Sequence, residues 1–261
     1  MGFEHNIRDT GVGMKSARVI VTGVSGSIGR AIAAYFTAQR YKVFGIDRIE
    51  RPADLAVDRY RQLDLERFVT APAEAKALAS EAATWTNGEG LSALVNNAAV
   101  QICGSLEDLD LSSWNRSLSV NVLAPFFLVR ALLTHLEQGG GSVINISSIH
   151  ARLTKPGFVA HSTTKAALSG LTRAMAVDLG SRVRVNAIEP AAIETPMLRA
   201  SFEGREADFE RLAACHPQGR IGSPEEVASL VFALTAGEFR FLHGACIDLS
   251  GGISARLYDP I

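Results

Sequence analysis

Short apolar runs alternate with amphipathic stretches along almost the whole chain, and this alternation limits the possible folds more than any other feature of the sequence. Strands buried on both faces are typically continuous β-branched runs, whereas helices show apolar residues every three to four positions. The expected strands are ARVIVTG (17–23), YKVFGID (41–47), YRQLDL (60–65), LSALVNN (91–97), SVINI (142–146), RVRVNAIEP (182–190) and ACIDLS (245–250). Helices are expected from about residue 28, over about 66–85 and 112–136, around 161–165 and from about 223. The pattern predicts an α/β fold with a doubly wound parallel sheet of about seven strands and helices on both faces.

The domain organisation follows from the length and from the lack of a linker. The chain has 261 residues, which suits one large α/β domain, and no Ser/Pro-rich segment divides it. Residues 1–15 are polar, so we expect a loosely ordered leader ahead of a single domain over 16–261. Residues 194–220 are polar and form a long connection, which predicts a mobile lid over the substrate.

Composition excludes several classes of function. A net charge of -1 without a Lys/Arg block gives no electrostatic case for nucleic acid. Because no run of about 18 apolar residues occurs, we expect no membrane span. Three cysteines without CxxC spacing and histidines away from ligand spacing indicate neither a disulfide framework nor a metal site. These features are typical of a cytoplasmic protein.

A glycine-rich turn directly follows the first strand and precedes an amphipathic helix. It reads TGVSGSIG over residues 22–29, and Gly23, Ser25, Ser27 and Ile28 are its candidate ligand-binding residues. Small residues allow a pyrophosphate to approach closely, and the helix offers unpaired N–H groups and a positive dipole end. In this context the turn predicts a dinucleotide-binding Rossmann fold. The alternative is a tight turn that binds no ligand.

Two charged residues at the end of the second strand bear on the choice of dinucleotide. Asp47 stands where an acid accepts hydrogen bonds from the ribose hydroxyls and repels a 2′-phosphate, which favours NAD over NADP. Arg48 beside it weakens this preference, because an arginine there can accept the phosphate. A solvated acid without a ligand is the alternative interpretation of Asp47.

The stretch 142–167 combines three groups that suit proton transfer. Its strand ends at the hydroxyls of Ser147 and Ser148, and the following helix carries His161 and Lys165 four residues apart, on one face. A hydroxyl, an imidazole and an ammonium could then act on one small substrate. A capped strand followed by an ordinary surface helix is the alternative.

These motifs together resemble the short-chain dehydrogenase/reductase family over about residues 15–254. The matching pieces are TGVSGSIG, LDL with Asp64, NNAA at 96–99, SVNVLAP with Asn121, the serine pair 147–148, Lys165, EPAAIETPM and DLSGG. The resemblance implies hydride transfer between NAD and an alcohol/carbonyl pair, and a homotetramer in which two long helices of each subunit pair across an interface. It implies a cofactor site that also includes Asp64, Leu65, Asn97, Ala98, Lys165, Pro190, Ile193 and Thr195.

By the same resemblance, Ser148 binds the substrate oxygen, Asn121 holds a water, and Lys165 binds the nicotinamide ribose and lowers the pKa of the catalytic acid. The family has tyrosine as that acid, four residues before the lysine, and His161 stands there in this chain. Imidazole has an ordinary pKa near 6.5, which a nearby ammonium lowers. Neutral imidazole can accept a proton in alcohol oxidation but is a poor donor for carbonyl reduction.

Three further positions depart from the family pattern: Ser27 and Ala191 replace the usual glycines, and Ala99 ends the NNAA motif. Each adds a small side chain that could weaken pyrophosphate binding. Candidate substrate residues are Gln101, His150 and Met197, although a solvent-facing loop histidine is an equal interpretation of His150. Three hypotheses remain open: an active dehydrogenase, an impaired member that binds NAD(H), and an active enzyme with an introduced substitution at His161.

Overall fold

The computed structural model describes residues 17–237 and 239–257, and the leader predicted for residues 1–15 lies outside them. One parallel sheet has the strand order β3-β2-β1-β4-β5-β6-β7. Its strands are β1 Arg18–Thr22, β2 Lys42–Asp47, β3 Arg59–Gln62, β4 Ala93–Asn96, β5 Ser142–Ile146, β6 Arg184–Pro190 and β7 Cys246–Leu249. The order reverses between β1 and β4, and ligands bind at the carboxyl ends of such a switch point.

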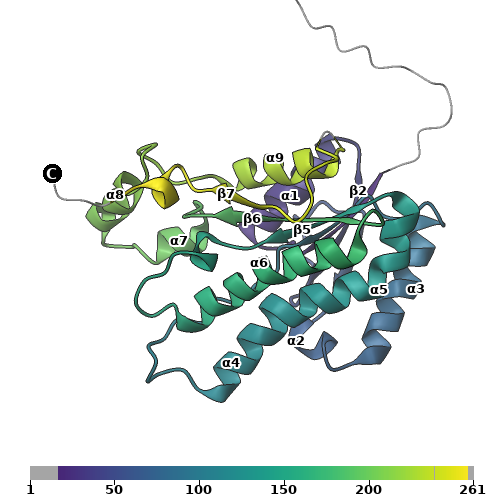
Figure 1. Cartoon of the computed structure of the whole chain (residues 1–261), viewed down its shortest axis with the longest axis horizontal. Coiled ribbons are helices and arrows are strands. Elements are labelled where there is room, and N and C mark those ends of the chain that lie inside the picture. Colours follow the sequence, from purple (N-terminus) through teal and green to yellow (C-terminus); the bar gives the residue numbers. More distant parts are fainter. Residues whose placement is uncertain (1–16, 238, 258–261) are drawn as a thin grey trace, which may run out of the picture.

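Helices cover both faces of the sheet, as predicted (Figure 1). On one face lie α1 (Ser27–Ala38) and α9 (Pro224–Thr235), which pack together against side chains such as Val19 and Val21. On the other lie α3 (Pro72–Thr86), α5 (Ala124–Gly139) and α6 (Val159–Leu179), above the alternate side chains of the same strands. Because both faces are buried, the strands are continuously apolar in sequence.

The third strand and the helix after it differ from the prediction. β3 ends at Gln62 rather than at residue 65, and the predicted helix 66–85 is divided into α2 (Leu65–Phe68) and α3. The division falls just before Pro72, which lacks an N–H and disfavours helical backbone in the residue before it. The proline was the signal that the sequence interpretation missed.

The long helix predicted over 112–136 is present but contains a π-helical turn. It consists of α4 (Leu111–Leu118), the turn η1 (Ser119–Leu123) and α5. Pro125 explains the turn, because it cannot supply the N–H that an α-helix directs at the carbonyl of Asn121. By length and composition alone the helical stretch Leu111–Gly139 could cross a membrane, but helices of a soluble core pass the same test, and one face of α5 packs into the core.

The segment after β6 carries two short helices, α7 (Pro196–Ala200) and α8 (Glu206–Ala214), beside the carboxyl end of the sheet (Figure 1). At the start of α9 the side chains of Ser223 and Glu226 form a capping box, in which each accepts the backbone N–H group of the other residue. Two short 3-10 turns complete the described elements, η2 (Ile149–Ala151) and η3 (Ile253–Ala255).

Candidate functional site

A cavity of about 570 Å³ lies at the carboxyl edge, within the usual size range of ligand sites. Eleven of the predicted cofactor residues line it: Gly23, Ser25, Ser27, Ile28, Asp47, Arg48, Asp64, Leu65, Asn97, Ala98 and Thr195. The predicted residues Lys165, Pro190 and Ile193 are not among its lining residues. The sequence interpretation missed several others, chiefly Val100, Arg116, Val120 and Pro196.

The glycine-rich turn is held against the segment after β4. Gly23 has a φ of 64°, and a Cβ there would lie 2.8 Å from the Cα of Ala98. Asn97 fixes this approach, since its Nδ2 donates to the carbonyls of Thr22 and Gly23 at 3.0 Å. A Cβ on Gly26 would meet only the carbonyl oxygen of Gly23, at 3.5 Å. The turn is therefore closed on one side and open at Gly26.

The first helix begins without a side-chain cap. Its N-cap is Gly26, and its first turn contains no acidic residue. By contrast, α9 has a complete capping box and two acids in its first turn. The N–H groups at the start of α1 are thus left for an external acceptor, at the positive end of the helix dipole. These N–H groups and the open turn before them fit a pyrophosphate group.

Asp47 is fixed at the edge of the same cavity. Its Oδ2 accepts the backbone N–H of Ser25 at 2.9 Å, and its Oδ1 accepts that of Arg48 at 2.8 Å. The carboxylate therefore joins the end of β2 to the glycine-rich turn and keeps a negative charge in the cavity wall. The side chain of Arg48 is exposed.

Asp64 and Leu65 lie at the start of α2. The Oδ1 of Asp64 caps the helix by accepting the N–H of Glu66 at 2.9 Å. Glu66 in turn lies 3.6 Å from the Nε of Arg116, on α4. This ion pair spans two elements that line the cavity, and no sequence motif pointed to it.

Ser148 begins the η2 turn at the end of β5. Its Oγ accepts the backbone N–H of His150 at 3.1 Å, so its own hydroxyl proton is left for another acceptor. Ser147 points the other way, into α6, where its Oγ donates to the carbonyl of Lys165 at 3.1 Å. The paired hydroxyls therefore have different surroundings.

Lys165 is only 4% exposed. Its Nζ donates to the carbonyl of Ile146 at 2.7 Å, and burial lowers the pKa of the ammonium to about 8. The predicted sharing of one helix face with His161 is confirmed, since both side chains lie on the buried side of α6.

Asn121 lies in the π-helical turn with its amide fully engaged. Its Oδ1 accepts the N–H of Val100 at 2.9 Å, while its Nδ2 donates to the carbonyl of Val100 and to the hydroxyl of Thr164. The side chain thus ties the segment after β4 to α6. Because both Nδ2 protons are in use, any water at Asn121 needs another group, such as its backbone carbonyl.

His161 is 6% exposed, and two rings pack on it. The ring centroids of His150 and Phe158 lie 5.6 and 5.8 Å away, both near perpendicular. Burial, and then the charge of Lys165, lower the pKa of His161 to about 4. The direction agrees with the sequence interpretation, but burial rather than Lys165 is the larger cause. Its Nδ1 has no hydrogen-bond partner among the described residues.

The remaining candidates are the three predicted substrate residues. Gln101 is exposed and lies 3.6 Å from the Sγ of Cys103. His150 lies in η2, half-buried, and its Nδ1 is 3.1 Å from the carbonyl oxygen of Leu153. Met197 falls in α7, but its side chain lies outside the part that the structure describes.

Pro190 ends β6, and the two candidates that follow it lead into the predicted lid. Ile193 pairs with Gly222 in an isolated bridge, and the Oγ1 of Thr195 accepts the N–H of Leu198. Thr195 and Pro196 line the cavity, so the start of α7 lies beside it.

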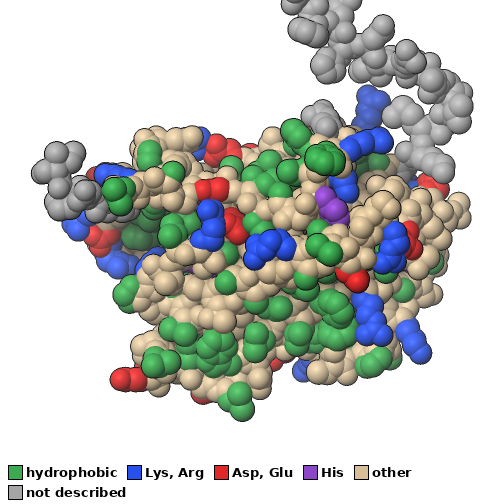
Figure 2. Space-filling model, viewed as in Figure 1, with side chains coloured by type: hydrophobic (Ala, Val, Ile, Leu, Met, Phe, Trp, Pro, Cys, Tyr) green, Lys and Arg blue, Asp and Glu red, His purple; other side chains and the backbone are tan. Residues whose placement is uncertain are grey.

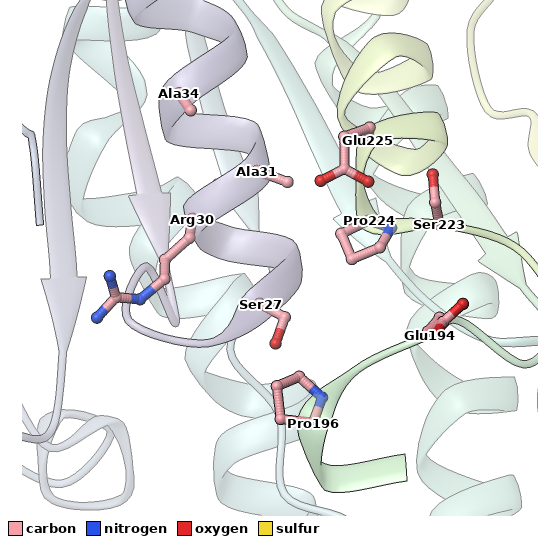
Figure 3. A pocket seen from close by; sticks show the side chains of 9 residues that line it. All are labelled: Ser27, Arg30, Ala31, Ala34, Glu194, Pro196, Ser223, Pro224 and Glu225. Atoms are coloured by element: carbon pink, nitrogen blue, oxygen red, sulfur yellow. The ribbon is translucent and has the colours of Figure 1, made fainter. Parts of the chain in front are cut away.

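A second cavity, of about 590 Å³, lies between the starts of α1 and α9 (Figure 3). Ser27 and Pro196 line both cavities and form the wall between them. Since Pro196 begins α7, the first part of the predicted lid borders both spaces.

The parallel sheet, the glycine-rich turn at its switch point and the uncapped helix define the class of dinucleotide-binding Rossmann proteins. A family model described as enoyl-(acyl carrier protein) reductase matches residues 23–254. The chain belongs to the short-chain dehydrogenase/reductase family, whose members are oxidoreductases.

Several characterised proteins are similar over most of their length. The chain is 35% identical to a 3-alpha-(or 20-beta)-hydroxysteroid dehydrogenase of Mycobacterium tuberculosis, over 91% of this chain and 89% of that protein. It is 33% identical to a 2-(R)-hydroxypropyl-CoM dehydrogenase of Xanthobacter autotrophicus, over 90% and 98%. The structure of an aldohexose dehydrogenase of Thermoplasma acidophilum superposes with a TM-score of 0.87 at 31% identity, covering 95% of this chain and 97% of that one.

Proposed function

We propose that this protein is an NAD-dependent dehydrogenase that transfers hydride between NAD(H) and an alcohol/carbonyl substrate. The observation that carries the proposal is the cavity at the carboxyl edge, where the open glycine-rich turn, the uncapped start of α1 and Asp47 converge. When bound there, the dinucleotide supplies a nicotinamide ring that accepts or gives hydride. The chain's own residues bind and orient it and handle the proton.

The preference for NAD rests on Asp47. Two backbone N–H groups fix its carboxylate in the cavity wall. The carboxylate would therefore repel a 2′-phosphate bound beside it. Arg48 is the residue that could reverse this preference. We expect NADH to bind at least about 10-fold more tightly than NADPH, and Asp47→Ser to remove the difference. Tighter binding of NADPH by the unaltered protein would contradict the assignment.

For the chemical step we propose the group Ser148, His161, Lys165 and Asn121. Ser148 has a free hydroxyl proton for the substrate oxygen, and His161 acts in place of the family's tyrosine as the proton acceptor. Because the pKa of His161 is about 4, its ring is neutral at pH 7 and only about one molecule in 1,000 holds the extra proton. Oxidation of an alcohol therefore suits this group better than reduction of a carbonyl.

The second candidate function is NAD(H) binding without substantial turnover, either as the natural state or through a substitution at position 161. Two observations favour it: the rings of His150 and Phe158 pack on His161, and His161 is not among the residues that line the cavity. An imidazole also extends less far than a phenol, and a misplacement of about 1 Å can cost about 100-fold in rate.

The deciding experiment follows NADH formation by this protein and by its His161→Tyr variant, side by side. Sugars, polyols and simple secondary alcohols are the substrates to test first. Comparable rates would support the dehydrogenase proposal, whereas turnover by the variant alone would support the binding protein. If neither protein binds NADH at millimolar concentration, both candidate functions are wrong.

We also propose a homotetramer, a single domain over 16–261 with a lid at about 194–220, and a cytoplasmic location. The homotetramer is supported by the outer surface of α4, η1 and α5, on which hydrophobic side chains are gathered (Figure 2). Leu111, Leu118, Leu123 and Phe126 are all exposed there. A second copy of this chain would cover this face, and a single species of monomer mass in light scattering would contradict the assembly.

A further inference from the structure

Two carboxylates lie directly opposite each other on the last two strands of the sheet. Glu189 of β6 is in register with Asp248 of β7, and the side chain of Glu189 is 1% exposed. Like charges opposite each other on neighbouring strands destabilise a sheet, and a buried carboxylate needs a partner. The two strands therefore require a compensating positive charge at this point.

Arg152 supplies that charge from a different segment of the chain. Its Nε donates to the Oε2 of Glu189 at 2.7 Å, and its Nη2 lies 3.4 Å from the Oδ2 of Asp248. Ser169 of α6 donates to the other oxygen of Glu189 at 2.8 Å, so both oxygens of the buried carboxylate are bound. A planar guanidinium with its donors in a fork suits a bridge between two carboxylates, whereas a lysine ammonium is a point charge. Arg152 thus joins the segment after β5 to both β6 and β7.

Arg152 also ends the η2 turn that Ser148 begins. Ser148 is the N-cap of this turn and Arg152 is its C-cap. The backbone N–H groups of Ala151 and His150 donate to the carbonyl and to the Oγ of Ser148, at 2.9 and 3.1 Å. The N–H of Arg152 donates to the carbonyl of Ile149 at 3.0 Å. The conformation of Ser148 therefore depends on that of the whole turn.

The side chain of Arg152 is the polar attachment of this turn to the sheet. Within residues 148–153, all of which the structure describes, no other side chain makes a hydrogen bond or an ion pair outside the turn. Burying an ion pair costs desolvation free energy, and apolar side chains of similar volume are often equally stable there. The ion pair is therefore better explained by the place at which it holds the turn than by a gain in stability.

We propose that Arg152 is a positioning residue, which fixes the η2 turn to the ends of β6 and β7 and thereby holds the hydroxyl of Ser148 toward the substrate oxygen. The inference rests on the proposed dehydrogenase function, in which Ser148 binds that oxygen. Arg152, Glu189 and Asp248 are not among the residues that line the cavity at the carboxyl edge. Loosening the turn should therefore slow the chemical step without weakening cofactor binding.

The first test measures the turn without any substrate, by hydrogen–deuterium exchange of the full chain. A double variant, Arg152→Met with Glu189→Gln, removes both charges of the ion pair and keeps an oxygen for Ser169, so it should fold. Exchange of the backbone N–H groups at 150–153 should become at least about 10-fold faster. Arg61→Met is the control, because Arg61 is also paired with two carboxylates and lies on β3, at the opposite edge of the sheet. Unchanged exchange at 150–153, or the same increase in the control, would overturn the proposal.

The second test uses turnover with an alcohol that the protein oxidises. The double variant should lose about 10–100-fold in kcat, while the Kd of NADH stays within about 2-fold. Arg152→Lys keeps a charge beside Glu189 but lacks the fork, so it should lose less activity than the double variant. An ion pair that serves only stability would leave the kcat of a folded variant unchanged, and that result would refute the positioning role.

A comparison without the Ser148 hydroxyl decides whether Arg152 acts through that group. In a Ser148→Ala background, removal of the ion pair should cost no further activity, because the hydroxyl that it holds is already absent. Losses that multiply would contradict the inference. If neither the unaltered protein nor His161→Tyr oxidises any alcohol, the proposed function fails, while the exchange measurement still decides whether Arg152 fixes the turn.

Discussion

Lys165 should make the folded protein more stable at alkaline pH. The side chain is 4% exposed and its partner is a neutral carbonyl, so burial lowers its pKa from 10.5 to about 8. A difference of this size between folded and unfolded protein corresponds to about 3 kcal/mol. Lys165 is therefore a buried charge whose cost can be measured.

The sign follows from proton binding. Below about pH 8 the lysine is protonated in both states and adds no pH dependence. Between pH 8 and 10.5 the unfolded chain binds more protons, so the free energy of unfolding rises with pH, by about 1.2 kcal/mol per pH unit near pH 9. Above pH 10.5 both states are neutral and the contribution is constant.

Urea denaturation of the protein and of Lys165→Met at pH 7, 8, 9 and 10 measures this contribution. Between pH 7 and pH 10 the unfolding free energy of the unaltered protein should rise by about 2–3 kcal/mol relative to that of Lys165→Met. Only the change with pH is used, because methionine also leaves the carbonyl of Ile146 without its donor. Lys155→Met, at an exposed position, is the control. Parallel stability curves for Lys165→Met and the unaltered protein would refute the reasoning.

Three further substitutions test other parts of the structure. Glu189→Gln removes a carboxylate that is 1% exposed and accepts hydrogen bonds from Arg152 and Ser169. The unfolding free energy should fall by about 1–3 kcal/mol, and a double-mutant cycle with Arg152→Met measures the contribution of the ion pair. Gly29→Ala places a Cβ against the backbone of the glycine-rich turn. Fluorescence titration should therefore show at least about 10-fold weaker NADH binding. Unchanged binding would contradict the close packing of the start of α1 against that turn. Ser223→Ala removes the N-cap of α9 and should cost about 1 kcal/mol in thermal denaturation, without changing NADH affinity.

The strands, the covering helices and the cofactor half of the site could be predicted because their signals are local. A β-branched run, a turn of small residues and an acid at a strand end are each readable over a few positions. They therefore located all seven strands and half of the residues of the cavity wall. The π-helical turn was missed although Pro125 marks it, because a helix with an early proline is usually interpreted as one element.

The other half of the site depends on contacts between distant segments. Arg152 and Glu189 are 37 residues apart, and only the pairing of β5 with β6 brings them together. The burial of His161 likewise requires η2 and the start of α6 to fold against each other. A sequence identifies such residues by type, but it does not give the depth at which their side chains lie, and depth is the larger cause of the low pKa of His161.

The two candidate functions make different demands on these halves. Binding a dinucleotide requires the glycine-rich turn, the start of α1 and Asp47. Lys165 alone does not distinguish the two candidates, because the family resemblance implies that it binds the nicotinamide ribose in both. His161 does distinguish them, because only turnover requires its imidazole to take a proton from a substrate. Its burial beneath two rings and its low pKa bear on that step and leave the cofactor half of the site unchanged. Turnover by the unaltered protein, compared with that of His161→Tyr, is therefore the property in which a working site and a silent one should differ most.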